Sequence, residues 1–213
     1  DGIRDIGVTG VQTCALPIYI MKKFAKHGVQ DFIICLGYKS EVIKDYFLNF
    51  KAYQSNFEVQ TSTGDTLLLE DVEDDWNVKL IETGLESNTG ERLKRVRKYL
   101  DDQNFFFTYG DGLSSQDLTA TYNLHLEKGT TVTLTAVNPP GRYGVVTVNA
   151  GIVNSFSEKS TSQNALINGG YFVVNENIFD ILGRFDNPSW ENEILPELAM
   201  HNQLDRKSTR LNS

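Results

Sequence analysis

Apolar residues recur with two different periods along the chain, and each change of period marks a predicted element. Residues 31–38, "DFIICLGY", are almost continuously apolar, which is typical of a strand covered on both faces. Residues 40–47, "SEVIKDYF", follow with helical spacing, and Ser40 is placed to cap the helix. An earlier helix is predicted over 19–28, with one face made of Ile20, Phe24 and His27. A strand, a loop and a helix in this order predict an α/β unit.

The alternation of strands and helices continues to residue 137. An amphipathic helix over 90–100 precedes the buried strand 104–109, and a helix over 114–129 precedes the buried strand 131–137. This order predicts an α/β fold with a mostly parallel sheet and helices on both faces. Past residue 140 the chain contains strands with few helices, which predicts a mixed or antiparallel β extension. Because repeats and low-complexity linkers are missing, we expect a single domain.

The two ends of the chain lack both periods. Residues 1–18, "DGIRDIGVTGVQTCALPI", and residues 205–213, "DRKSTRLNS", show neither helical nor strand spacing. Both strings resemble translations of sequencing-adapter DNA, and we interpret them as non-native, in the way that fusion scars are set apart from a fold. Ordinary frayed termini are the alternative interpretation. The predicted domain therefore covers residues 19–204.

Composition and charge exclude several classes of protein. Apolar and charged fractions of 40% and 23% are ordinary for a globular chain, so neither disorder nor a membrane span is expected. A net charge of -8 argues against a nucleic-acid partner, but a nucleotide needs only a few local cations and amides. Two cysteines, Cys14 and Cys35, are too few for a disulfide scaffold, and Cys35 is interpreted as a small buried hydrophobe. Without a recognisable secretion signal, the expected location is the cytoplasm.

A single acidic residue stands at the end of a predicted buried strand. Asp111 follows "FFFTY", lies between Gly110 and Gly112, and precedes a helix. Ligands of parallel sheets collect beyond the carboxyl ends of the strands, and flanking glycines let a bulky ligand approach the backbone. A carboxylate there suits Mg²⁺, although it could instead cap the next helix or complete a turn. Ligand spacing is missing for the histidines, so we predict no zinc site at His27, His125 and His201.

Five motifs occur along the chain in the order known from one enzyme family. They are "TGLESNTGERLKRVRKYL", "TYGDG", "NPPGRYGVV", "SFSEK" and "INGGYFVV". With them the sequence resembles the sugar-1-phosphate nucleotidyltransferases from about residue 20 to residue 204. The resemblance implies a Rossmann-like, nucleotide-diphospho-sugar transferase fold, typically in a homo-oligomer. It also implies transfer of a nucleotidyl group to a sugar 1-phosphate, with Mg²⁺ and release of pyrophosphate. The first and last motifs favour CTP and glucose 1-phosphate as the substrates.

The resemblance assigns residues 87–92 to recognition of the nucleotide. Ser87, Thr89 and the backbone at Gly90 would hydrogen-bond the base, and Arg92 would reach the base or a phosphate. In this loop Glu91 replaces a second glycine that the family usually has. The basic residues that follow are interpreted as a solvated helix face, made of Lys94, Arg95 and Arg97.

The resemblance also implies a metal site and a sugar site. Asp111 would be the catalytic metal ligand, and Gly110 would contact the nucleotide. The sugar phosphate would be held by Gly144, Glu158, Lys159, Asn168, Gly169 and Glu191. Within this set, Lys159 would be a catalytic cation beside the phosphate, and Glu158 would accept bonds from sugar hydroxyls. A bulge in a buried strand is the alternative for Asn168 and Gly169, and core packing is the alternative for the neighbouring Trp190.

Two further family features are not found in the sequence. The family has a glycine-rich strand and loop that holds the triphosphate, and residues 1–18 do not resemble it. It also has a second metal-binding aspartate, expected shortly after Leu204. We therefore expect the 213-residue chain to be an incomplete domain with little or no activity of its own.

Other functions remain open. A uridylyl- or thymidylyltransferase would share most of the motifs. A non-catalytic sensor of nucleotides or sugar phosphates could keep the same fold. A nucleotide-sugar glycosyltransferase is a more distant alternative, because such enzymes usually place two acidic residues in "DxD", whereas "YGDG" offers one.

Overall fold

The chain divides into two compact units, each built from two separate segments. The computed structural model describes residues 10–71, 73–138, 145–149, 152–157 and 166–210. Unit 1 comprises residues 1–102 and 179–196, and unit 2 comprises residues 103–178 and 197–213. The chain passes from one unit to the other between residues 102 and 103, within α6 (Ile178–Leu182) and within α7 (Leu195–Met200). The expectation of a single domain with limits at 19 and 204 stays a prediction.

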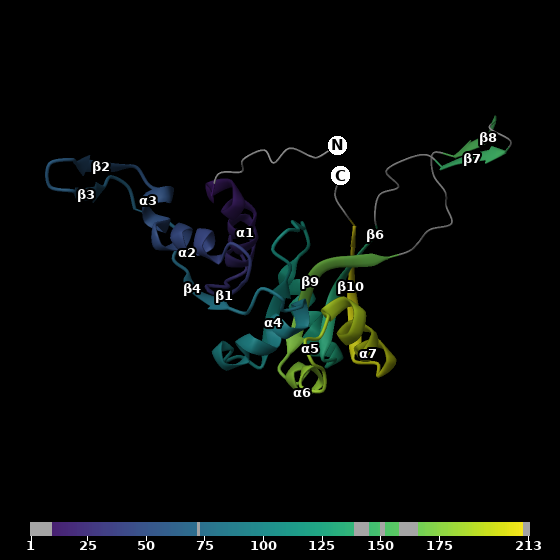
Figure 1. Cartoon of the computed structure of the whole chain (residues 1–213). Coiled ribbons are helices and arrows are strands. Elements are labelled where there is room, and N and C mark those ends of the chain that lie inside the picture. Colours follow the sequence, from purple (N-terminus) through teal and green to yellow (C-terminus); the bar gives the residue numbers. More distant parts are fainter. Residues whose placement is uncertain (1–9, 72, 139–144, 150–151, 158–165, 211–213) are drawn as a thin grey trace. The chain divides into compact units, whose positions relative to one another are not determined.

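A two-stranded parallel sheet forms the base of unit 1. β1 (Asp31–Leu36) pairs with β4 (Asn77–Glu82) in parallel along their whole lengths. α1 (Gly10–Ala25) and α2 (Ser40–Leu48) pack with this sheet (Figure 1). The buried centre consists of Ile18, Met21 and Tyr46. Around it lie the partly buried side chains Phe32, Ile34, Ile43, Phe47, Phe50, Trp76 and Val78.

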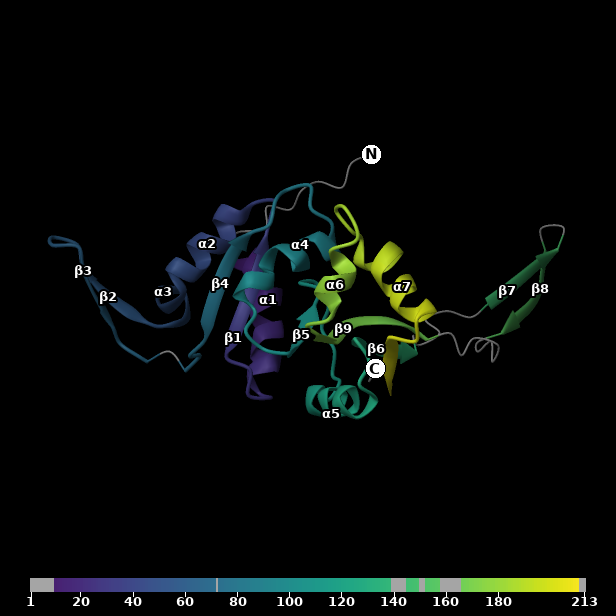
Figure 2. The ribbon, with the colours of Figure 1, turned by 90° about the horizontal axis from the view of Figure 1, so that it is seen from below.

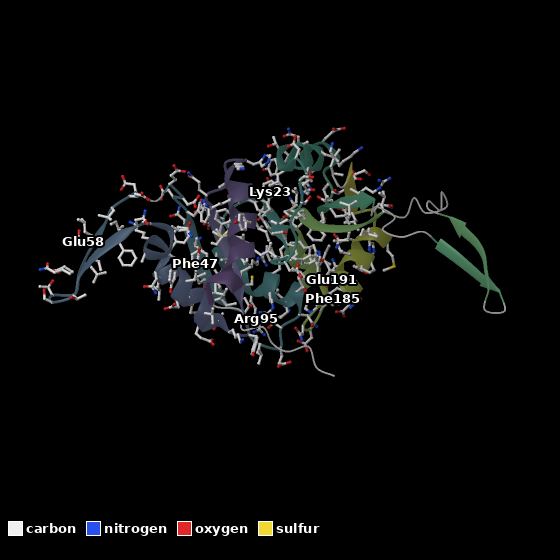
Figure 3. The ribbon with its side chains drawn as sticks, turned by 90° about the horizontal axis from the view of Figure 1, so that it is seen from above. Lys23, Phe47, Glu58, Arg95, Phe185 and Glu191 are labelled. Carbon is white, nitrogen blue, oxygen red and sulfur yellow. The ribbon has the colours of Figure 1, made fainter. Side chains whose placement is uncertain are left out.

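The rest of unit 1 is made of short elements. They are α3 (Phe50–Gln54), β2 (Phe57–Gln60), β3 (Asp65–Leu68), α4 (Thr89–Val96), the 3₁₀ turn η1 (Arg97–Tyr99) and the π-helical turn η2 (Trp190–Ile194). β2 and β3 form an antiparallel hairpin with Phe57 opposite Leu68, and every residue of both strands is exposed. Figure 3 labels Glu58 on this hairpin.

Unit 2 contains a four-stranded sheet in the order β10-β6-β9-β5 (Figures 1 and 2). Its strands are β5 (Asn104–Thr108), β6 (Val132–Asn138), β9 (Ile167–Asn175) and β10 (Leu204–Arg210). β9 is antiparallel to both of its neighbours, whereas β10 is parallel to β6. A separate hairpin joins β7 (Val145–Asn149) and β8 (Ile152–Ser157). The α/β class and the antiparallel extension are therefore confirmed. In the sheet, β9 lies between β5 and β6, which follow one another in the predicted order of strands.

The helix α5 (Leu118–Lys128) of unit 2 starts and stops for local reasons. Asp117 accepts a hydrogen bond from the Ala120 amide (3.0 Å), which caps the first turn. Gly129 ends the helix with a φ of 63°, in the left-handed region that glycine tolerates. The helix packs on β6 and β9, in which Val132, Val173 and Val174 are fully buried. Residues 114–117 precede the helix, so it begins later than predicted.

Both ends of the chain adopt more regular structure than their patterns predict. Residues 10–18 form the first part of α1, because Ile18 is buried beside Tyr46 on α2. Residues 204–210 pair with β6 through backbone hydrogen bonds, which do not require an apolar pattern. A segment can form a helix or a strand whether or not it belonged to the original gene, so these elements do not reveal the origin of the two ends. The non-native origin of 1–18 and 205–213 therefore stays a prediction.

Two local expectations in unit 1 are wrong. Ser40 is the first residue of α2 and makes no capping bond, since Lys39 occupies the cap position with a φ of 55°. His27 is exposed beyond the end of α1, because the helix stops at Ala25, whereas Ile20 and Phe24 are buried as predicted.

Candidate active site

The guanidinium group of Arg92 holds together three parts of unit 1. Its Nη1 donates to the Leu36 carbonyl (3.0 Å) and to the Thr83 hydroxyl (2.8 Å), and its Nη2 donates to the Leu85 carbonyl (3.3 Å). A Cβ atom added at Gly37 would lie 2.8 Å from the same Nη1. Arg92 therefore shapes the predicted nucleotide loop from within, and its guanidinium is already engaged by protein oxygens.

Ser87 is also engaged inside this loop. Its hydroxyl donates to the Thr83 carbonyl, which Arg95 Nη1 reaches as well (2.8 Å). The turn needs Gly84, whose φ is +92° and whose added Cβ would lie 2.7 Å from Arg95 Nη1. Because the Ser87 hydroxyl donates its hydrogen to the protein, it would meet a ligand as an acceptor.

The start of α4 is fixed against residues 187–188 of the same unit. The Asn88 amide donates to Asn187 Oδ1 (2.8 Å), and the Glu91 amide donates to the Pro188 carbonyl (3.2 Å). Gly90 is buried, and an added Cβ would lie 2.7 Å from the Pro188 oxygen. Packing alone therefore explains this glycine, while Thr89 beside it is half-buried. Base contacts by Thr89 and Gly90 stay predictions.

The basic face of α4 is not simply solvated, which corrects the expectation. Lys94 Nζ donates to the Phe185 carbonyl (3.0 Å), and Arg95 Nε pairs with Glu91 (2.8 Å). The Arg97 guanidinium lies 5.3 Å from the centre of the Phe179 ring. Figure 3 labels Arg95 and Phe185 among the side chains of this unit. Lys94 thus connects α4 to the segment at Phe185, and Arg97 in η1 connects to Phe179 in α6.

Asp111 lies on an exposed loop directly after β5 in unit 2. Its side chain takes part in no hydrogen bond or ion pair described for residues 10–210 outside the gaps. A Cβ added at Gly110 or Gly112 would meet no described atom within 4 Å. Packing inside the protein therefore does not require a glycine at either position. The space around both glycines lies beside the Asp111 carboxylate.

The predicted sugar strand is the first part of β9. Asn168 is exposed, whereas Gly169 packs on β6, since an added Cβ would lie 3.0 Å from Val137 and 3.1 Å from the Thr135 oxygen. The pairing of β6 with β9 shifts register between Leu134 and Ala136. The interpretation of Gly169 as part of a bulge therefore has direct structural support.

The remaining predicted sugar residues are less informative. Glu191 is exposed on η2, where its Oε2 lies 3.4 Å from the Ser189 hydroxyl, and Figure 3 labels it. Trp190 is fully buried, so its interpretation as core packing is confirmed. Gly144, Glu158 and Lys159 lie outside the described residues.

A polar network lies at the opposite end of β5 from Asp111. His125 is buried, with Nδ1 2.9 Å from the Thr133 hydroxyl and Nε2 3.1 Å from Asn104 Oδ1. Burial lowers the pKa of His125. A pocket of about 240 Å³ opens beside this network. Side-chain amides that line it are hydrogen-bonded to each other, since Asn175 Nδ2 donates to Asn104 Oδ1 (2.9 Å). The network is structural, because both ring nitrogens of His125 have hydrogen-bond partners within it.

Sequence reasoning missed two tyrosines next to the candidate site. Tyr109 precedes Gly110, and Tyr171 follows the second glycine of "INGGY". The Tyr171 hydroxyl donates to the Gly112 carbonyl (2.8 Å), and burial raises the pKa of this phenol. The available signal was an aromatic residue beside Gly110 and another beside Gly170. The hydrogen bond from Tyr171 to Gly112 could not be predicted, because it depends on the pairing of β9 with β5.

The fold and the loops described above define a class of protein. A model of the Nucleotidyl transferase family matches residues 9–211, and the chain belongs to this family. The crystal structure of HddC from Yersinia pseudotuberculosis is similar, with a TM-score of 0.60 and 20% identity, and the match covers 91% of this chain and 76% of that one. This likeness confirms the fold.

Curated relatives are more specific. The glucose-1-phosphate cytidylyltransferase of Salmonella typhimurium is 44% identical over 187 residues, which cover 87% of this chain and 72% of the relative. A probable glucose-1-phosphate cytidylyltransferase of Bacillus subtilis is 37% identical over 186 residues, with the same two coverages. A UTP–glucose-1-phosphate uridylyltransferase of Staphylococcus epidermidis is 27% identical over 181 residues, which cover 77% of this chain. The cytidylyl-transferring relatives are thus clearly more similar than this uridylyl-transferring one.

Proposed function

We propose that the protein transfers a cytidylyl group from CTP to glucose 1-phosphate, giving CDP-glucose and pyrophosphate. The similarity to glucose-1-phosphate cytidylyltransferases over most of the chain carries this proposal. A phosphate oxygen of glucose 1-phosphate would attack the α-phosphorus of CTP, and the bond from that phosphorus to the β-phosphate oxygen would break. The reaction needs no covalent intermediate with the protein, so its demands are position and charge.

We assign these tasks to two sets of residues. In unit 1, Ser87 and Thr89 would accept and donate hydrogen bonds at the edge of the base, and Arg92 would keep the loop in shape. In unit 2, Asn168 and the backbone beside it would contact the sugar. Lys159 would neutralise the sugar phosphate, and Glu158 would accept bonds from sugar hydroxyls. The smaller contributions proposed from the resemblance are those of Gly90, Gly110, Gly144, Gly169 and Glu191.

Mg²⁺ is part of the proposal, and Asp111 fits it. The carboxylate is exposed and has open space beside it. In the described part of the chain, no group of three or more His, Cys, Asp or Glu side chains is arranged to hold a metal. Phosphate oxygens and water would therefore complete the coordination, as Mg²⁺ favours. When bound, the ion would offset negative charge on the phosphates.

A competition assay tests the substrate assignment. The protein is given glucose 1-phosphate, Mg²⁺ and equal amounts of CTP, UTP, dTTP and GTP, and nucleotide sugars and pyrophosphate are measured. The assay is run on the 213-residue chain and on a version with the glycine-rich segment of the family placed before Tyr19. We expect CDP-glucose as the main product. If UDP-glucose or dTDP-glucose were the main product, the proposed cytidylyl transfer would be wrong, and the protein would be assigned uridylyl or thymidylyl transfer. Nucleotide binding without pyrophosphate from either version would indicate a binding protein.

The cellular context is proposed on the same basis. We infer a cytoplasmic homo-oligomer that supplies CDP-glucose for dideoxysugars of surface polysaccharides. No helix among the described residues combines the length and apolarity that a membrane crossing requires. Sedimentation of the purified protein measures its assembly, and fractionation of cells measures its location.

A further inference from the structure

The loop that carries Asp111 is tied to β9 on its far side by Tyr171. The Tyr171 hydroxyl donates to the carbonyl of Gly112, the residue after Asp111, across 2.8 Å. Tyr171 is 2% exposed, so its ring is fixed in the core of unit 2. A hydroxyl on a fixed ring defines one position for the carbonyl that accepts from it, and therefore for the peptide next to Asp111.

The near side of the loop is tied to the same stretch of β9. The Thr108 hydroxyl donates to the Gly170 carbonyl (2.9 Å), and Asn168 Nδ2 donates to the Tyr109 hydroxyl (3.2 Å). Gly170 has a φ of +77°, and an added Cβ would lie 2.9 Å from Cδ2 of the Tyr109 ring. The second glycine of "INGG" therefore lets the Tyr109 ring approach the strand closely, a task that the family resemblance does not assign.

Asp111 has little else to hold it. Two glycines flank it, and each glycine widens the range of backbone conformations open to the loop. A metal ligand must be held close to its working position before the ion and nucleotide arrive, because otherwise binding has to order the loop. Farther along, Gln116 is hydrogen-bonded to Thr135, and the contacts from residues 168–171 are the described ones nearest to Asp111.

We propose, on the basis of the proposed function, that Tyr171 is a positioning residue for Asp111, with Gly170 and Tyr109 as its supports. Its hydroxyl fixes the Gly112 peptide so that the neighbouring carboxylate is presented to a divalent cation bound with CTP. Asn168, the proposed sugar contact, is linked to Tyr109, so the same stretch of β9 serves both substrates.

The test compares Tyr171→Phe with Tyr122→Phe. The first change removes the anchoring hydroxyl and keeps the buried ring. The second removes the hydroxyl of Tyr122, a partly buried tyrosine of unit 2 whose ring centroid lies 5.7 Å from that of Phe106. Backbone ¹⁵N relaxation gives the order of residues 110–113 in the metal-free protein, and calorimetry gives the affinity for Mn²⁺ in the presence of CTP.

We expect Tyr171→Phe to lower the order parameters of residues 110–113 from about 0.85 toward 0.6. We also expect it to weaken Mn²⁺ binding with CTP by roughly tenfold, as loss of an outer-shell contact does at metal sites. Tyr122→Phe should change neither quantity. A loop that stays rigid, or an unchanged Mn²⁺ affinity, would overturn the positioning role. Calorimetry is run on the version that carries the glycine-rich segment before Tyr19. If that version, otherwise unaltered, failed to bind Mn²⁺ with CTP, the proposed function would be overturned, while a loosened loop would still identify the anchor.

Discussion

The Arg92 guanidinium donates a 2.8 Å hydrogen bond to the hydroxyl of Thr83, a residue with no exposed surface. The same hydroxyl donates to the Leu36 carbonyl (2.8 Å), so β1 and the nucleotide loop share one buried junction. Arg92 thereby acts as an internal brace, and the loop at residues 83–92 depends on it.

Replacing Arg92 by lysine should destabilise unit 1. An ammonium group cannot donate in the directions of the guanidinium fork, so bonds to Leu36, Thr83 and Leu85 cannot all survive. We expect a loss of about 1–3 kcal/mol in the free energy of unfolding, together with weaker CTP binding. Urea denaturation and calorimetry measure the two effects. Arg97→Lys is the control, because Arg97 is exposed on the next turn; equal losses in both variants would contradict the brace.

Gly90→Ala and Gly112→Ala should have opposite effects on stability and ligand binding. At Gly90 the new Cβ would meet the Pro188 oxygen at 2.7 Å, so α4 or residues 187–188 must shift, and we expect a loss of at least about 1 kcal/mol. At Gly112 no described atom lies within 4 Å, so stability should hold or rise by about 0.5 kcal/mol while binding of Mn²⁺ with CTP falls. Thermal denaturation and calorimetry separate the outcomes. A destabilised Gly112→Ala with normal binding would contradict this reading of the loop.

Asp111 and Asp117 offer a matched pair of acidic residues. Asp111→Asn removes an exposed charge without a described partner, so stability should change by less than about 0.5 kcal/mol while Mn²⁺ affinity with CTP falls at least about tenfold. Asp117→Ala removes the cap of α5 and should cost about 1 kcal/mol without affecting Mn²⁺. An Asp111→Asn protein that bound Mn²⁺ normally would exclude Asp111 as the metal ligand.

His125 should make unit 2 less stable in mild acid. Burial lowers its pKa below the 6.5 of an ordinary histidine, so between the two values the unfolded chain binds more protons than the folded one. The free energy of unfolding therefore falls as pH falls through 6.5, and the fall ends once pH is below the folded pKa. Urea titrations at several pH values measure this slope. His125→Gln should flatten it, whereas replacing the exposed His201 by Gln should leave it; an unchanged slope in His125→Gln would refute the assignment.

Cys35 should react slowly with thiol reagents. Burial raises its pKa to about 11, although the nearby Arg92 charge opposes this, so almost no thiolate exists at neutral pH. In a Cys14→Ser background, we expect labelling to be slow in the native protein and fast after unfolding in urea. Equally rapid labelling in both states would contradict the partial burial of the thiol.

Much of the fold could be predicted from local pattern. The run "DFIICL" became β1 and "NFFFT" became β5, because continuous apolar stretches of this length favour strands, although most of their residues are only half-buried. Gly129 ended its helix as expected, since a left-handed residue is the usual stop. The same pattern placed Asp111 after the end of β5. The cap of α2 was predicted wrongly, because Lys39 and not Ser40 occupies the cap position.

The sequence by itself determined most of the strands and helices between the two ends and the acidic residue that follows β5, because these depend on side chains within a few positions of one another. Tertiary structure alone decided that β9 enters between β5 and β6, that β10 pairs with β6, and that Tyr171 reaches Gly112. Such contacts join residues far apart in the chain. They depend on strand order and backbone pairing, for which the sequence carries no local signal.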